Sequence, residues 1–223
     1  MDFSTIWHPL FLSFKTVGAS FVLFIICGIP LAYLLAKEHL PHKWLLDSLV
    51  TMPLIFPPIA IGFLLLLLLG RNGWLGVYFD KINIHFIFEF KGLVIAGFIA
   101  GLPLMVKPLQ AAIELFPKSI CEAAYVNGKN RFQTFIWVVL PCIKPTLIAA
   151  LLVSSARSLG EVGITLMLGG NIVGKTDTMS LAIYNAVFDG DYSLALILCA
   201  LLIIISIGVF FALHHLTHTK QTL

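Results

Sequence analysis

Charged residues are scarce in this sequence. Asp, Glu, Lys and Arg make up 11% of its 223 residues, whereas hydrophobic residues make up 59%. Because an ordinary soluble domain carries about 25% charged residues, this composition excludes a globular core surrounded by water. We therefore expect an integral membrane protein whose surface is mostly in contact with lipid.

Cysteines and clusters of basic residues are few as well. The net charge of +3 is spread along the loops, which argues against binding of nucleic acid. The cysteines show no CxxC spacing, so the sequence suggests neither a disulfide framework nor a metal site, and no cofactor is expected. The first apolar stretch has no A-x-A-like cleavage site, so we interpret it as a retained first helix. The four cysteines are Cys27, Cys121, Cys142 and Cys199.

What the chain has in abundance is long uncharged runs. Each lipid-exposed span must satisfy its own backbone hydrogen bonds, and the short alternating segments of a β-barrel are absent. The sequence therefore predicts an all-α, polytopic fold with about five transmembrane helices in one domain, residues 1–223, whose core is roughly residues 13–211. The expected helices cover roughly residues 13–36, 48–70, 93–113, 145–167 and 192–213.

Lys and Arg are distributed unevenly between the two sets of loops. Eight follow the first, third and fifth expected helices, and five lie on the opposite side. Because short loops rich in Lys and Arg remain in the cytoplasm, the loop from Lys107 to Lys144 is predicted to be cytoplasmic. This orientation puts the N-terminus outside and the C-terminus in the cytoplasm.

Three prolines interrupt the second expected helix: Pro53, Pro57 and Pro58. Proline removes a backbone donor and kinks a helix, which a membrane tolerates where neighbouring helices or a cavity satisfy the freed carbonyls. Two interpretations stay open. Pro57 and Pro58 form either a static kink or part of a bent helix that lines a pathway.

A short helix is expected in the loop between the third and fourth spans. Ser119 and Glu122 have the S-x-x-E spacing of a capping box, and Asn127-Gly128 is typical of a helix stop. From spacing alone this is a capped amphipathic helix, and Glu122 needs no role beyond capping. Its small residues would let another surface approach closely: Ala123, Ala124 and Gly128.

The same loop continues to residues 138–141, which read Val-Val-Leu-Pro. The whole segment resembles the EAA signature of ABC-importer permeases: E-A-A, three residues, Gly, nine residues, then I-x-L-P, here with Val138 for isoleucine. In that family the short helix docks into a cleft on a cytoplasmic ATPase subunit. The resemblance implies this coupling role for Glu122, Ala123, Ala124 and Gly128.

Other segments resemble the molybdate permeases in particular. The resemblance implies two copies around one translocation path in the inner membrane, served by two cytoplasmic ATPases and an external solute-binding protein. It favours import of an oxyanion, with molybdate first and tungstate or sulfate as alternatives, since they share its charge and shape. The matching segments are residues 45–48, 53–58, 103–106, 156–163 and 170–176.

Arg157 and Glu161 are expected inside the fourth helix, within the membrane. Charges there are costly, and a spacing of four residues puts both on one helix face, where they can pair. They form either a structural ion pair or a gate that the oxyanion passes. Both interpretations stay open.

Residues Gly169–Thr176 satisfy G-x-x-x-x-G-K-T, the pattern of a phosphate-binding loop. That loop requires a strand before it and an acidic metal partner, whereas the end of a membrane helix is expected here. We therefore predict no nucleotide binding and no catalytic residues, with ATP hydrolysis left to a partner subunit.

A membrane-embedded enzyme is the alternative from another class. It would need convergent acid, base or metal ligands, and no H-E-x-x-H or paired-carboxylate pattern occurs. His214, His215 and His218 are interpreted as a solvated tail and not as a metal site.

Overall fold

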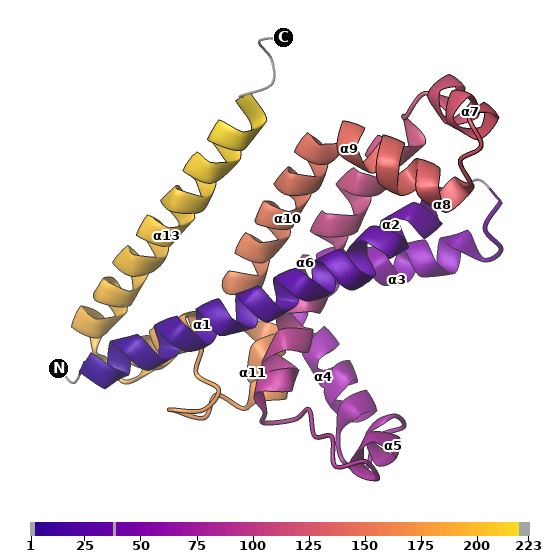
Figure 1. The fold of residues 1–223 in the computed structure, drawn as a ribbon. Coiled ribbons are helices and arrows are strands. Elements are labelled where there is room, and N and C mark those ends of the chain that lie inside the picture. The colour runs from indigo at the N-terminus through magenta and orange to yellow at the C-terminus, as the bar shows by residue number, and fades with distance from the viewer. Residues whose placement is uncertain (1–2, 38, 219–223) are drawn as a thin grey trace.

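The computed structural model describes the backbone of residues 3–37 and 39–218 and the side chains of residues 5–37 and 39–211. Every regular element within these ranges is a helix (Figure 1). The all-α prediction is confirmed.

The first helix is longer than expected. α1 (Phe3–Leu23) runs through a π-helical turn at Phe24–Gly28 into α2 (Ile29–Leu35). Together they form an apolar helix that is 31 residues long from Thr5 to Leu35.

The second expected span is two helices, α3 (Lys43–Ile55) and α4 (Pro58–Leu69). Between them Phe56 and Pro57 are extended, with ψ of 144° and 131°. A residue that precedes a proline is driven away from the helical conformation, and here two successive residues precede one. Pro58 then occupies the first position of α4, where its missing donor costs nothing.

The remaining helices follow in order. They are α5 (Gly76–Asp80), α6 (Phe90–Glu114), α7 (Lys118–Val126), α8 (Arg131–Thr134), a π-helical turn at Phe135–Val139, α9 (Leu140–Cys142), α10 (Lys144–Leu159), α11 (Gly163–Gly169), α12 (Met179–Phe188) and α13 (Tyr192–His218). The fourth expected span is thus divided too, because α10 ends at Leu159 and α11 begins at Gly163. The sequence did not indicate α5 and α12.

Three helices in the described ranges are long and apolar enough to cross a membrane: Thr5–Leu35, Phe90–Glu114 and Tyr192–Phe211. A bent pair, Arg131–Cys142 with Lys144–Leu159 at 79°, makes a fourth if it counts as one span. The sequence indicated about five. The difference arises because the expected helices at residues 48–70 and 145–167 are each broken into two shorter pieces.

α6 forms the centre of the bundle and packs against α1, α2, α3, α10 and α11. Its glycines permit the close approach. A Cβ on Gly97 would lie 2.1 Å from the hydroxyl of Ser158 in α10, and one on Gly101 would lie 2.5 Å from the ring of Phe24. Small residues at such contacts let helix backbones pack tightly where lipid provides no hydrophobic driving force.

The two ends of the bundle differ. α7, α8 and α9 lie at the same end as the C-terminal part of α13, whereas the start of α1 lies at the opposite end (Figure 1). We call the end of the bundle that carries α7 the α7 end. Two ion pairs join α3 and α6 toward it, Lys43–Glu114 and Lys107–Asp47.

Candidate functional site

α7 contains three of the four expected coupling residues, Glu122, Ala123 and Ala124, and Gly128 lies two residues after its end. The predicted capping box is wrong, because α7 begins at Lys118 and no side chain caps it. Pro117, with ψ of 120°, is the residue at its N-terminal boundary, so Ser119 already lies in the first turn.

The predicted stop of α7 is confirmed. Gly128 has a φ of 78°, in the left-handed region that glycine adopts without strain. Its N–H donates to the carbonyl of Tyr125 (2.9 Å), and the N–H of Lys129 donates to that of Ala124 (3.1 Å). These two bonds form a Schellman motif, which satisfies carbonyls that would otherwise lack a partner at the helix end.

The small residues of the expected coupling segment do not share one exposed face. Ala123, Gly128 and the neighbouring Glu122 are exposed, whereas Ala124 is buried. Ala124 is the buried residue of α7, and the elements that pack against α7 include α8 and the following π-helical turn. The surface that a partner can reach therefore contains Glu122, Ala123 and Gly128.

A capping box that the sequence analysis missed begins the helix after α7. The side chain of Asn130 accepts from the N–H of Gln133 (2.8 Å), and the side chain of Gln133 accepts from the N–H of Asn130 (3.1 Å). The N-x-x-Q spacing would have identified it. It fixes the start of α8, directly after the turn that ends α7.

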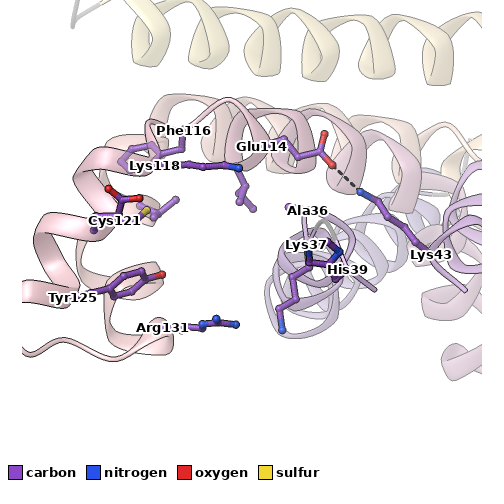
Figure 2. Close-up of a pocket in the computed structure, with 13 residues that line it drawn as sticks. Ala36, Lys37, His39, Lys43, Glu114, Phe116, Lys118, Cys121, Tyr125 and Arg131 are labelled. Atoms are coloured by element: carbon purple, nitrogen blue, oxygen red, sulfur yellow. Dashed lines mark hydrogen bonds and ion pairs between the residues drawn. The ribbon is translucent and has the colours of Figure 1, made fainter. Parts of the chain in front are cut away.

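A cleft of about 670 Å³ separates α7 and α8 from the turn that joins α2 to α3 (Figure 2). Lys43 and Glu114 pair across 3.1 Å on its rim. Burial raises the pKa of the Cys121 thiol in its wall. The residues that line the cleft are Ala36, Lys37, His39, Lys43, Ile113, Glu114, Phe116, Lys118, Cys121, Glu122, Tyr125, Arg131 and Val139.

The two helix breaks are adjacent in space. A Cβ on Gly163, at the start of α11, would lie 2.8 Å from the Cβ of Pro58, at the start of α4. One turn further along α4, a Cβ on Gly62 would lie 2.8 Å from the Cβ of Met167. The structure thus brings the proline pair of the second expected span against the charged segment of the fourth.

Arg157 and Glu161 form the expected ion pair, with Nη1 and Oε2 2.7 Å apart. The expectation that both lie in one continuous helix is wrong, because α10 ends at Leu159 and Glu161 lies in the break. Its other carboxylate oxygen accepts from the N–H of Ile164 (2.8 Å), in the first turn of α11. The side chain of Glu161 is 1% exposed and that of Arg157 is 33% exposed.

The Gly169–Thr176 loop differs from a phosphate-binding loop in its surroundings and in its contacts. A helix, α11, precedes it. The hydroxyl of Thr176 donates to the carbonyl of Gly169 (2.7 Å), and Lys175 donates to Glu89 (2.6 Å). This bond lowers the pKa of the Glu89 carboxyl. The side chain of Thr176 therefore bonds within the loop itself, and that of Lys175 binds Glu89 at the start of α6.

The structure holds no candidate metal centre in the part of the chain that it describes. No group of three or more His, Cys, Asp or Glu residues there could hold an ion, and the four cysteines are free. His214, His215 and His218 belong to α13, but their side chains lie outside the described ones.

The chain belongs to the family described as "Binding-protein-dependent transport system inner membrane component", which matches residues 28–219. It is therefore a permease component of an ABC transporter, a multi-pass inner membrane protein whose ATPase is a separate subunit. This confirms the resemblance found in the sequence.

Individual relatives are consistent with this class. The molybdenum transport system permease protein of Escherichia coli is 35% identical over 182 residues, 81% of this chain and 80% of that protein. A sulfate transport system permease protein of Escherichia coli is 31% identical over 189 residues, 85% of this chain and 68% of that protein. The same fold occurs in the crystal structure of a bacterial alginate ABC transporter with its periplasmic protein. That match has a TM-score of 0.77 at 18% identity and covers 96% of this chain and 79% of the other.

Proposed function

We propose that this chain imports an oxyanion, molybdate in the first place, as the permease of an ATP-driven importer. The 35% identity to a molybdenum permease supports molybdate, and the similarity to a sulfate permease leaves sulfate and tungstate as alternatives. The transporter would contain two copies of this chain, two cytoplasmic ATPases and an external solute-binding protein.

The single observation that carries the coupling assignment is the form of α7. It is a separate helix at one end of the bundle, ended by its own Schellman motif. It presents Glu122 and Ala123 to solvent, and Gly128 is exposed two residues past its end. Because Glu122 does not cap the helix, its carboxylate is available to a partner. Ala124 is buried, and its role in coupling would be to pack α7 against α8. We place the α7 end in the cytoplasm and the start of α1 outside.

We assign the pathway to the paired breaks of α4 and α11. Arg157 is one third exposed beside these breaks, so its guanidinium can attract an oxyanion while buried Glu161 holds it in place. Pro57 is exposed and Pro58 contacts the α11 break, so a movement of α4 would reach Arg157 through this contact. A purely structural Arg157–Glu161 pair is the alternative.

Uptake by reconstituted proteoliposomes tests this function. Vesicles with the permease, its ATPase and the binding protein should accumulate labelled molybdate only with ATP. Excess tungstate or sulfate, added separately, measures the selectivity. Uptake of molybdate that neither ATP nor the ATPase affects would contradict the proposal, and sulfate uptake that molybdate does not inhibit would reassign the cargo.

A further inference from the structure

The cleft beside α7 carries an excess of positive charge. Among the described residues, four Lys and Arg side chains line it against two carboxylates, and one of those, Glu114, already pairs with Lys43. The basic side chains are Lys37, Lys43, Lys118 and Arg131. Lysine and arginine that converge on one cavity indicate an anionic ligand with several acceptor oxygens.

Two of these cations extend into the space from opposite walls. Arg131 comes from α8 and Lys37 from the end of α2, and Figure 2 shows both beside the open cleft. Lys37 contacts the ring of Tyr33 at 5.0 Å. Among the described residues, no carboxylate forms an ion pair with either cation. The Tyr125 side chain, on the α7 wall, supplies a further donor.

The cleft also lies where two of the spanning helices end. Its lining includes Ala36, directly after α2, and Glu114, the last residue of α6. Apolar side chains share this lining, Ile113 and Phe116, and the adjacent Leu115 is 85% exposed. Basic side chains lie beside apolar surface at the end of a spanning helix. A ligand with both an anionic group and an apolar part therefore fits this cleft better than a free ion does.

We propose that this cleft binds the phosphate headgroup of an anionic phospholipid, held between Lys37 and Arg131. Basic pockets between membrane helices on the cytoplasmic side bind such headgroups, and the volume of about 670 Å³ is that of an ordinary small-ligand site. The headgroup would bridge the α2–α3 turn to α8 and so set the position of α7. This inference rests on the proposed cytoplasmic location of the α7 end.

Native mass spectrometry of the full chain in detergent, titrated with phosphatidylglycerol, tests the site. The variant Lys37→Gln/Arg131→Gln removes both central charges. Each basic residue contributes about five-fold in affinity near an anionic surface, so the tightest lipid should bind about thirty-fold more weakly. The control Lys129→Gln/Lys144→Gln removes the same charge at the α7 end outside the cleft, and its tightest lipid should be retained.

Two further titrations distinguish an anionic lipid headgroup from a free anion as the ligand of the cleft. Phosphatidylcholine should not replace phosphatidylglycerol, and millimolar inorganic phosphate or molybdate should not displace it. Equal lipid retention by both double variants would overturn the proposal, as would displacement by free phosphate or molybdate. Because this readout needs neither ATPase nor transport, it is independent of whether α7 couples ATP hydrolysis.

Discussion

α7 and the paired breaks of α4 and α11 are held in place by different means. α7 contacts little beyond α8 and the next turn, most of its residues are exposed, and its end is set by local hydrogen bonds. The breaks are in van der Waals contact with each other, and the buried carboxylate of Glu161 holds both Arg157 and the first turn of α11. Substitutions on an exposed surface such as that of α7 should therefore leave the bundle folded. Substitutions at a bend that is buried inside the bundle should destabilise it.

Gly128→Asp should produce the largest effect, a loss of uptake without loss of the folded chain. A Cβ there meets no atom within 4 Å, so the membrane helices stay intact, but the charged side chain would hold the ATPase away. The positive φ adds about 1 kcal/mol of strain. Pull-down of the ATPase beside an uptake assay measures both consequences.

Gly190→Asp is the matched control for this strain. Gly190 has a φ of 74° with no atom within 4 Å, and it lies between α12 and α13. It should bind the ATPase normally. A Gly128→Asp protein with full uptake, or a Gly190→Asp protein that loses the ATPase equally, would remove the distinction between α7 and the rest of the surface.

Glu161→Ala should have the next largest effect, on stability. It removes the partner of Arg157 and the acceptor for the N–H of Ile164, which we expect to cost about 3 kcal/mol. Glu161→Gln keeps an acceptor for Ile164 and should cost less. Thermal unfolding in detergent measures both.

Arg157→Ala separates the two roles of the pair. Because it leaves the buried Glu161 carboxylate without its cationic partner, it should lower the melting temperature as well. Impaired uptake at matched amounts of folded protein, beyond the loss seen with Glu161→Ala, would indicate a pathway role. Normal uptake at ordinary protein levels would leave only the structural interpretation of the pair.

Gly163→Ala should have a smaller effect. The added methyl group would meet the Cβ of Pro58 at 2.8 Å and the backbone N of Ile59 at 2.9 Å, so α4 must shift, at a cost of about 1–2 kcal/mol. Gly208→Ala, in α13 with no atom within 4 Å, is the control and should leave the melting temperature unchanged or slightly higher. Equal melting temperatures for the two variants would show that the breaks are not tightly packed.

The smallest effect concerns pH. Hydrogen bonding to Lys175 lowers the pKa of the Glu89 carboxyl in the folded chain. The stabilisation that this ion pair gives the folded chain is therefore present above the pKa of Glu89 in the unfolded chain. It is lost as the pH falls through the lower pKa of Glu89 in the folded chain. Since both side chains are about half exposed, the contribution is a few tenths of a kcal/mol. Lys175→Met should lower the melting temperature slightly near pH 7 and by less as the pH falls below the unfolded pKa of the carboxyl, and an equal decrease at every pH would contradict the ion pair.

The sequence by itself determined the elements whose causes are local. Long uncharged runs made α6 and α13 recognisable, because apolar length alone decides whether a helix can span lipid. Asn127-Gly128 predicted the end of α7, because a left-handed glycine satisfies the last carbonyls wherever the helix packs. The family signature on this helix was also readable from spacing.

Only the tertiary structure decided the features that depend on contacts distant in sequence. Prolines predicted a kink after α3 but not that α4 would pack against α11, because this contact needs the facing glycines, Gly62 and Gly163. The four-residue spacing predicted the Arg157–Glu161 pair but not the helix break between them. The cleft beside α7 arises from the way α2, α6 and α8 meet, and no local pattern specifies the space between helices that are far apart along the chain.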